Sequence, residues 1–199
     1  MIKSIGVTIT IIIVSIIVFG LILSLSNALA QQLDVLAPLS ISGGQNTNAS
    51  SVLTTAQFTV AVGSTGDDRL TGTNASDVIV GLAGNDIIHG AQGDDIIQGD
   101  ADADSLFGDA GNDIIQGGTQ SDYLEGGNGN DILAGGDDDD VLIGGNGNDK
   151  LYGEAGDDVL IGGPGADYFD CGDGVDVVLD FNLTQGDDNA GNCEVLQSG

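Results

Sequence analysis

The sequence predicts an all-β protein, a right-handed parallel β-roll (a β-helix or solenoid) of about six 18-residue coils, preceded by an apolar N-terminal segment. A nine-residue repeat runs from Gly63 to Leu179 as thirteen units with no insertion. Its sixth position is always Asp, its eighth is always apolar, and its first is Gly except for Cys171 in the last unit. A period held over this length indicates stacked repeats that share one continuous core.

The composition argues against a conventional globular core. The chain of 199 residues contains 34 glycines but only five Phe, three Tyr and no Trp. A strongly charged chain with so few aromatic residues is typical of disorder. The repeat overrides this expectation, because its apolar residues recur at one fixed position and can stack on one another.

The charge is almost entirely negative. There are 31 acidic residues against three basic ones, which gives a formal net charge of −28. Nucleic acid is therefore excluded as a partner, because the chain has too few cations to neutralise phosphates. Multivalent cations are the natural partners. The alternative is a solvated acidic surface, which does not explain why the Asp column stays in phase with the Gly column.

Each repeat unit divides into a six-residue turn and a three-residue strand. We expect glycine at the first position, and usually at the fourth, to allow backbone conformations closed to other residues. The residues Asp113-Ile114-Ile115 lead into Gln116, and strand alternation points Ile115 inward and its neighbours outward. Two units complete a flattened coil, and successive coils stack about 4.8 Å apart through parallel ladders.

This stacking places the Asp side chains in two rows, one on each edge of the roll. Neighbouring carboxylates in a row would repel one another, and the turns also present backbone carbonyls. Ca²⁺ suits both groups, because it takes roughly six to eight oxygen ligands at about 2.3–2.6 Å in flexible geometry. The candidate metal residues are Asp68, Asp77, Asp86, Asp95, Asp104, Asp113, Asp122, Asp131, Asp140, Asp149, Asp158, Asp167 and Asp176, with the turn glycines Gly126, Gly144 and Gly162.

The repeat resembles the RTX (hemolysin-type) calcium-binding nonapeptide G-G-x-G-x-D-x-U-x. The full form GGxGxD stands at residues 126–131, 144–149 and 162–167. The resemblance implies a β-roll in which Asp carboxylates and turn carbonyls of successive coils share Ca²⁺, and which is disordered until calcium binds. Members of that family are often tails of secreted enzymes or toxins with a C-terminal export signal, whereas the export segment expected here is N-terminal.

The two rows are expected to be unequal. Position four carries Asp102, Gln120 and Asp138 in alternate units, which lie on one edge, while the three complete GGxGxD turns lie on the other. The stronger row is built on Asp95, Asp113, Asp131, Asp149 and Asp167. The weaker row is built on Asp86, Asp104, Asp122, Asp140 and Asp158. We expect roughly eight to ten bound Ca²⁺ ions in total.

The N-terminal segment predicts export. An apolar run covers residues 5–25, Lys3 precedes it, and an Ala-x-Ala site ends at Ala30. Residues 1–30 are therefore interpreted as a signal peptide. Because the run is long enough to span a bilayer, an uncleaved membrane anchor is the alternative. Both place the repeats outside the cytoplasm, either secreted or anchored at the cell surface through residues 5–25.

The remaining segments flank the repeats. Residues 31–62 are interpreted as a linker that ends in a capping strand, Gln57 to Val62. The calcium-binding β-roll covers residues 63–179. Residues 180–199, where the period fails, are expected to form a C-terminal cap.

Two cysteines, Cys171 and Cys193, suggest one disulfide in an exported chain. Such a bond would close a loop of about 20 residues and contribute roughly 3 kcal/mol by loop entropy. The alternative is a pair of buried free thiols.

Three short patterns of the form Asn-x-Ser/Thr begin at Asn48, Asn74 and Asn182. This pattern marks N-glycosylation acceptors, although it is short enough to arise by chance.

The seventh position is unusually apolar for one that faces outward. This pattern indicates either the β-branched preference of a sheet face or an exposed patch that packs on a partner. The residues concerned are Val78, Ile87, Ile96, Ile114, Ile132, Val141, Val159 and Val177.

No catalytic activity is expected. The sequence contains neither an HExxH nor a GxSxG motif, and its single histidine, His89, occupies an outward position. We therefore expect a secreted or surface-associated calcium-binding protein with a structural role and no enzymatic one. The alternatives are an adhesin or interaction module that uses the flat sheet faces, and an accessory module of an extracellular enzyme. The expected partners are calcium ions and a cell-surface or matrix polymer, and a membrane only if residues 1–30 stay uncleaved.

Overall fold

The computed structural model of the chain describes residues 51–54 and 59–196, and in these ranges it is a parallel β-solenoid with no helix. The expected signal or anchor segment, residues 1–30, lies outside the described residues, as does most of the expected linker. Within the described ranges, no helix has the length and apolarity that crossing a membrane requires.

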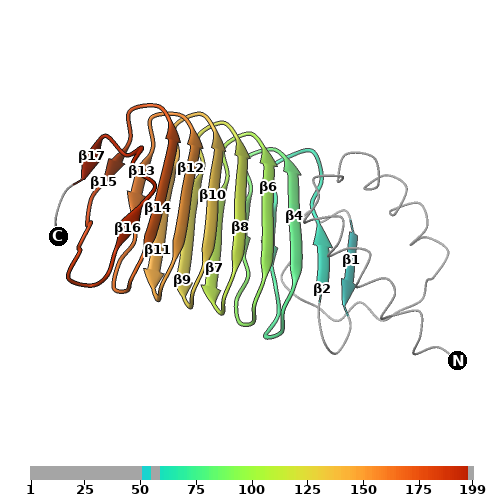
Figure 1. Cartoon of the computed structure of the whole chain (residues 1–199). Helices are drawn as coiled ribbons and strands as arrows, with labels where there is room; N and C mark the ends of the chain where they lie inside the picture. Colours follow the sequence, from blue (N-terminus) through green and yellow to red (C-terminus); the bar gives the residue numbers. More distant parts are fainter. Residues whose placement is uncertain (1–50, 55–58, 197–199) are drawn as a thin grey trace, which may run out of the picture. The chain divides into compact units, whose positions relative to one another are not determined.

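Two sheets face each other across the core, and consecutive strands of the repeats alternate between them (Figure 1). The nine-stranded sheet contains β1 (Ser51–Thr54), β2 (Thr59–Val62), β4 (Val78–Ala83), β6 (Ile96–Ala101), β8 (Ile114–Thr119), β10 (Ile132–Asp137), β12 (Lys150–Ala155), β14 (Tyr168–Asp173) and β16 (Asp188–Asn189). The eight-stranded sheet contains β3 (Arg69–Thr71), β5 (Ile87–His89), β7 (Ser105–Ala110), β9 (Tyr123–Asn128), β11 (Val141–Asn146), β13 (Val159–Ile161), β15 (Val177–Val178) and β17 (Val195–Leu196).

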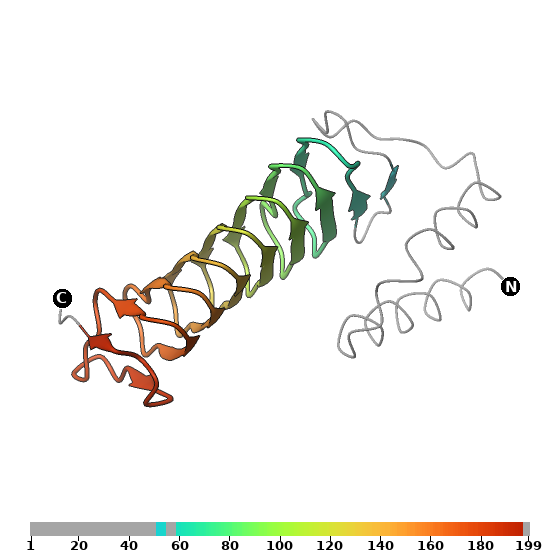
Figure 2. The same ribbon diagram turned by 90° about the horizontal axis from the view of Figure 1, so that it is seen from above.

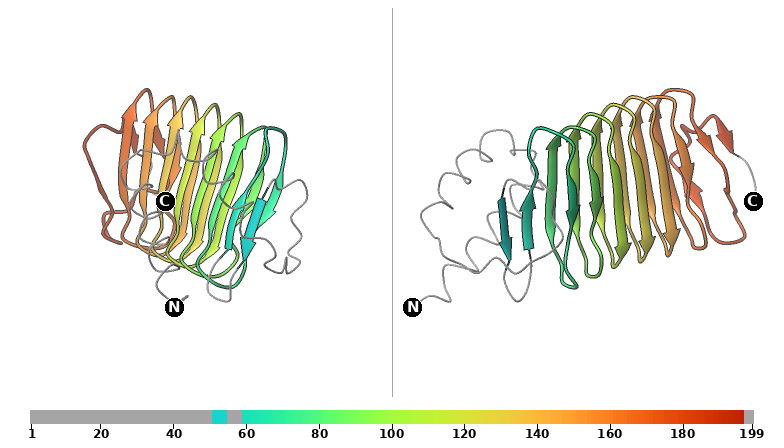
Figure 3. Two further views of the ribbon diagram at one scale, coloured as in Figure 1. Left: turned by 90° about the vertical axis from the view of Figure 1, so that its right-hand side faces the viewer. Right: turned by 180° about the vertical axis from the view of Figure 1, so that it is seen from behind.

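The register confirms the 18-residue coil. Leu133 of β10 pairs in parallel with Leu151 of β12 on one side and with Ile115 of β8 on the other. Successive coils therefore lie one behind another, as Figures 2 and 3 show. Most repeat strands have six residues and not the expected three, because the ladder continues through the glycines that follow, as at Gly136↔Gly118.

The core is a single file of apolar side chains from each sheet. All thirteen residues at the eighth position are buried, with at most 1% of their surface exposed. Burial at one fixed position explains how a glycine-rich chain still builds a continuous core. These residues are Leu70, Ile79, Ile88, Ile97, Leu106, Ile115, Leu124, Leu133, Leu142, Leu151, Leu160, Phe169 and Val178.

The seventh-position residues face outward, as expected. Ile96, Ile114 and Ile132 are cross-strand neighbours on β6, β8 and β10, and Ile114 and Ile132 are 45% and 37% exposed. This face of the sheet therefore carries an aliphatic ladder in contact with solvent.

The N-terminal end of the stack begins before the repeats. The described part of the expected capping strand, Thr59–Val62, is β2, which pairs in parallel with β4. Its antiparallel neighbour β1 overlaps the end of the segment interpreted as linker, at residues 51 and 52. Thr59 takes the register position of an Asp, one coil before Asp77, and its backbone N–H donates to Asp77 Oδ1.

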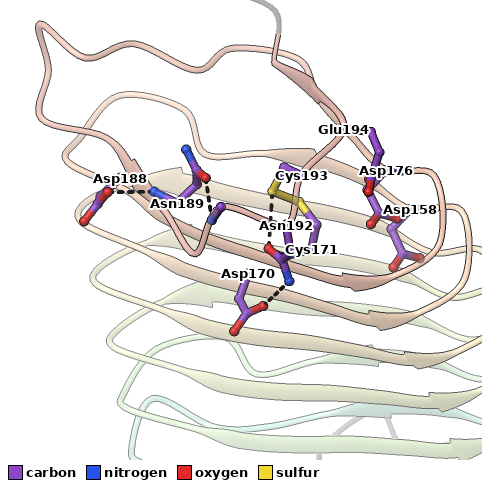
Figure 4. Close-up of a disulfide and its surroundings, with 10 residues drawn as sticks. Asp158, Asp170, Cys171, Asp176, Asp188, Asn189, Asn192, Cys193 and Glu194 are labelled. Atoms are coloured by element: carbon purple, nitrogen blue, oxygen red, sulfur yellow. Dashed lines mark hydrogen bonds between the residues drawn. A yellow bond between two sulfur atoms is a disulfide. The ribbon is translucent and has the colours of Figure 1, made fainter.

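The C-terminal cap is fastened by the predicted disulfide. Cys171 and Cys193 are bonded, with their Cα atoms 5.2 Å apart (Figure 4). Asn192 lies between them and the last full coil, where it accepts the Cys171 N–H and donates to Asp170 Oδ1 at 2.7 Å. Phe181 packs against the core residue Phe169 with ring centroids 6.1 Å apart. The cap therefore continues the core beyond the point where the repeat ends.

We predict that replacing both cysteines, Cys171→Ser with Cys193→Ser, lowers the unfolding free energy of the calcium-loaded protein by about 3 kcal/mol, because the loop they close regains its freedom in the unfolded state. Thermal unfolding in saturating Ca²⁺ measures this. The wild type treated with a reductant serves as the control and should behave like the double variant. An unchanged melting temperature in both samples would contradict the assignment of a stabilising role.

Candidate metal centre

The thirteen repeat aspartates point into the turns and not into solvent. Each is at most 4% exposed. In each row, one carboxylate oxygen accepts the backbone N–H of the Asp one coil earlier. Asp95 N–H donates to Asp113 Oδ1 at 2.7 Å, and Asp113 N–H donates to Asp131 Oδ1 at 2.8 Å. The opposite edge has the same ladder, as at Asp104 N–H to Asp122 Oδ1, 2.8 Å.

The second oxygen of most of these carboxylates has no hydrogen-bond partner among the described residues, although it is buried. A buried polar atom without a partner is costly, and more so when it carries charge. Each such oxygen therefore needs either a proton or a cation. The eleven oxygens are Oδ2 of Asp86, Asp95, Asp104, Asp113, Asp122, Asp131, Asp140, Asp149, Asp158, Asp167 and Asp176.

A backbone carbonyl of the next coil converges on the same point. A Cβ atom added to Gly144 would lie 2.5 Å from Asp149 Oδ2 and 2.7 Å from the carbonyl oxygen of Gly162. Gly126 has the corresponding neighbours, Asp131 Oδ2 and the Gly144 carbonyl. Carboxylate and carbonyl oxygens brought together in a buried turn are the donor set that Ca²⁺ prefers. A Cβ atom at Gly162, the third glycine predicted from the complete motifs, would meet Asp167 Oδ2 and the Phe169 ring.

The expected reason for glycine at the first position is wrong. None of the twelve first-position glycines has a left-handed φ, and the residue is needed there because a Cβ would collide with the carboxylate. Left-handed conformations occur at the second and fourth positions instead, for example at Gly145 (φ 108°) and Gly147 (φ 142°). The second position escaped sequence reasoning, because several of its residues are not glycine, such as Leu82 (φ 89°).

The second position decides whether the carboxylate is satisfied. In the first two units it is Ser64 or Thr73, neither of which is left-handed. Ser64 donates its N–H (2.5 Å) and hydroxyl (3.0 Å) to Asp68 Oδ2, and Thr73 makes the same pair of bonds to Asp77. In the other eleven units the residue is left-handed and its N–H turns away, as Gly145 N–H does to the Gly162 carbonyl. These are the eleven units with an unpartnered Oδ2.

The rows continue into the C-terminal cap through two acids outside the repeat. Asp187 accepts the Asp167 N–H at 3.1 Å, and its other oxygen accepts the Asn182 N–H at 2.7 Å. Glu194 accepts the Asp176 N–H at 3.0 Å, and Figure 4 shows it beyond Asp176 on that edge. Sequence reasoning missed both. The spacing of Asp187 is 20 residues and not 18, while Glu194 keeps the spacing but changes the residue type.

A second ladder, also missed from the sequence, runs along the fifth position. Asn112 N–H donates to Asp94 Oδ1 at 2.8 Å, and Asn130 N–H donates to Asn112 Oδ1 at 2.9 Å, so each side chain serves the coil after it. On the other edge this ladder reaches Ala103, which has no side-chain acceptor for the next coil. In the sequence, this ladder is indicated by the frequent Asp and Asn at the fifth position, directly before the Asp of the sixth position.

The middle of that second edge carries the three residues that replace glycine at position four. Asp102, Gln120 and Asp138 all have left-handed φ, between 73° and 77°. Gln120 Nε2 donates to Asp102 Oδ1 at 2.9 Å, and a hollow of about 380 Å³ opens beside Gln120, lined also by Ala103, Ser121 and Asp138. The Asp ladder itself stays unbroken here. The unequal filling of the two rows therefore remains a prediction.

Burial raises the pKa of the row carboxyls. For Asp95 and Asp113 burial is the main cause and neighbouring carboxylates add to it, so that the pKa reaches about 7 despite the opposing backbone hydrogen bond. The pKa of Asp131 is raised in the same way. The others with a pKa raised to about 6 or 7 are Asp86, Asp104, Asp122, Asp140, Asp149, Asp158 and Asp167.

The donor set is mixed and not a cluster of side chains. Over residues 51–54 and 59–196 no three His, Cys, Asp or Glu side chains come together as a metal site. Each turn supplies one buried carboxylate, and carbonyls such as that of Gly162 lie beside it. His89 lies outside the turns, stacked on Phe107 at 4.5 Å and paired with Asp109 at 3.1 Å, on the outer face as predicted.

Comparison with known families agrees with this geometry. The family model described as the RTX calcium-binding nonapeptide repeat (4 copies) matches residues 62–97, 89–124, 107–142, 116–151 and 143–178. These overlapping matches cover residues 62–178, more than half of the 199 residues. A search of curated proteins found no match.

We predict that Gly144→Ala strongly weakens calcium-induced folding. The new Cβ would collide with Asp149 Oδ2 and the Gly162 carbonyl oxygen, so that either the backbone is strained or these two oxygens move apart. A loss of about 1–3 kcal/mol is expected in the calcium-loaded protein. The matched control is Gly66→Ala, since nothing lies within 4 Å of a Cβ at Gly66 and its φ is not left-handed. Equal melting temperatures for the two variants would refute the crowding argument.

We predict that the metal-free protein folds better in acid. The row carboxyls have a higher pKa in the folded state, so the folded chain binds more protons than the unfolded chain between the ordinary carboxyl pKa, about 4, and the folded values of about 6–7. The unfolding free energy therefore falls as pH rises through this window. Circular dichroism of the calcium-free chain should show more β-structure at pH 5 than at pH 8, and a signal that grows with pH would overturn the argument.

Proposed function

Because the chain belongs to the RTX calcium-binding nonapeptide-repeat family, we propose that it is an exported structural protein whose β-roll folds when Ca²⁺ fills the two rows of turns. The observation that carries this proposal is the set of eleven buried, unpartnered Asp Oδ2 atoms. At neutral pH these positions favour either an unfolded chain or a bound cation. Calcium binding thereby becomes part of folding.

The free energy of calcium binding is large enough to drive folding of the repeats. Extracellular calcium sites have dissociation constants of about 10⁻⁴–10⁻³ M. At a tenfold excess of free calcium, each site adds about 1.4 kcal/mol to stability. About ten sites then supply on the order of 14 kcal/mol, which is comparable to the whole stability of a typical domain.

The partners of each carboxylate indicate which of the thirteen hold calcium. In Asp77, Oδ1 accepts the Thr59 N–H and Oδ2 accepts the N–H and the hydroxyl of Thr73, so this carboxylate needs no cation. In Asp68, Oδ2 accepts the same two groups from Ser64, while Oδ1 has no partner among the described residues. We assign the calcium to the unpartnered Oδ2 atoms of the eleven later units and treat Asp77 as a metal-free position. Asp187, whose oxygens both accept backbone N–H groups, ends one row at the other side.

Two features support export to the surface or the medium. Residues 1–30 have the pattern of a secretory signal or an anchor. The Cys171–Cys193 disulfide suits an oxidising compartment. The role proposed there is structural and not catalytic, because each repeat carboxylate is held in a ladder by backbone hydrogen bonds. Surface association with a polymer is the setting we favour.

The proposal is tested by adding calcium to the metal-free chain at pH 7.5. We expect circular dichroism to change from a disordered spectrum to a β spectrum, and calorimetry to report roughly eight to ten ions per chain. Magnesium at the same concentration should produce little folding. A strong β signal before calcium is added, and unchanged by it, would sink the proposal.

Two matched variants locate the ions. Asp131→Asn keeps the Oδ1 acceptor of the ladder but removes one charged oxygen, and should lose one or two bound ions. Asp77→Asn makes the same change in the same row, at a carboxylate whose Oδ2 is already hydrogen-bonded, and should leave the number of ions unchanged. Equal losses from both variants would show that the first units also bind calcium.

A further inference from the structure

The C-terminal cap presents an exposed loop between Asn182 and Asp187 that calcium binding does not explain. We propose that Asn182 is an N-glycosylation site, with an oligosaccharide attached to its amide nitrogen. The inference rests on the export included in the proposed function, and is independent of calcium binding.

The sequence Asn182-Leu183-Thr184 is folded into a turn in which the third residue contacts the first. Thr184 donates its hydroxyl to Asn182 Oδ1 at 2.6 Å and its backbone N–H to the same oxygen at 3.0 Å. Leu183 between them is 75% exposed, and Thr184 is exposed. Both bonds use the amide oxygen of Asn182, so the amide nitrogen keeps its hydrogens for an incoming group.

The loop is held in place from below. The Asn182 carbonyl accepts N–H groups from Gln185, Gly186 and Asp187. Asn182 N–H donates to Asp187 Oδ2 at 2.7 Å, and Asp187 is itself buried against Asp167. The acceptor residue is therefore held in an ordered turn, partly exposed, and the two residues that follow it are exposed.

The hydrogen bond from Thr184 suits the chemistry of amide glycosylation. A donor on the amide oxygen stabilises the negative charge that develops on this oxygen as a base removes a proton from the amide nitrogen, and the deprotonated nitrogen is the better nucleophile. Asn182 Nδ2 attacks C1 of a sugar carried on a lipid diphosphate, and a C–N bond forms as the C1–O bond breaks. The lipid diphosphate leaves, and a base of the transferase takes the amide proton.

The second pattern in the described residues lacks this arrangement. In Asn74-Ala75-Ser76, the hydroxyl of Ser76 accepts the N–H of Asp94 in the next coil and so belongs to the fifth-position ladder. Ala75 N–H is bonded to Thr73, and the next residue is the buried Asp77. This segment is fixed within the stack. We expect Asn74 to stay unmodified in the folded protein.

Two arms test the inference. In the first, the full chain is produced through the secretory pathway of a glycosylating host, and intact mass is measured before and after a peptide N-glycosidase. In the second, the purified calcium-loaded full chain is incubated with an oligosaccharyltransferase and a lipid-diphosphate oligosaccharide. The second arm does not depend on export of this chain, so a failure of export and a failure of the acceptor are distinguished.

Four variants test which asparagine is modified and whether the Thr184 hydroxyl is required. Asn182→Gln should remove the glycan. Thr184→Val keeps the shape but lacks the hydroxyl, and should lower occupancy about tenfold or more. Thr184→Ser should retain it, and Asn74→Gln should change nothing. Modification of Asn182 in either arm supports the site. An unmodified Asn182 in both arms, a glycan on Asn74 in its place, or full occupancy in Thr184→Val overturns it, while circular dichroism in calcium verifies that each variant is folded.

Discussion

The structure depends on one constraint, the burial of a carboxylate in every turn. From Asp77 on, each repeat Asp holds its neighbouring coil in register through Oδ1, which accepts a backbone N–H 18 residues earlier. In the eleven later units Oδ2 is left without a partner, and burial raises the pKa of carboxyls such as Asp113. The interaction that sets the geometry thus also creates the electrostatic demand that a cation meets. Stability and ligand binding therefore use the two oxygens of the same carboxylate.

Other features follow from making room for that carboxylate. Glycine at the first position leaves space for Oδ2 and for the carbonyl of the next coil. A left-handed second residue removes the N–H that would otherwise satisfy the oxygen, as Ser64 and Thr73 show where it is not left-handed. A unit with glycine first and a left-handed second residue therefore keeps one buried carboxylate oxygen without a hydrogen-bond partner. In the first two units the second residue is not left-handed, and that oxygen is hydrogen-bonded.

Much of this could be predicted from the sequence, because a strict period fixes register. The 18-residue coil, the buried eighth position and the pair Cys171–Cys193 all follow from spacing and parity. The hydrogen bonds within the turns could not be predicted, since periodicity says which residues align and not which atoms face one another. For that reason the hydrogen bonds from Ser64 to Asp68 Oδ2 could not be predicted. Asp187 and Glu194 were missed because the cap aligns with the rows in space after the repeat has ended in sequence.

The disulfide at the end of the roll gives the stack a preferred starting point. In a solenoid each coil contacts only its neighbours, so order spreads from whichever end is formed first. The Cys171–Cys193 bond restricts the last coil even in the unfolded chain, and each carboxylate offers its Oδ1 to the coil that precedes it in the chain. Assembly is then templated from the C-terminal end toward the N-terminal end. If the chain is exported with its N-terminus first, this C-terminal end leaves the cell last. The repeats would then cross the membrane unfolded and fold into a solenoid only afterwards.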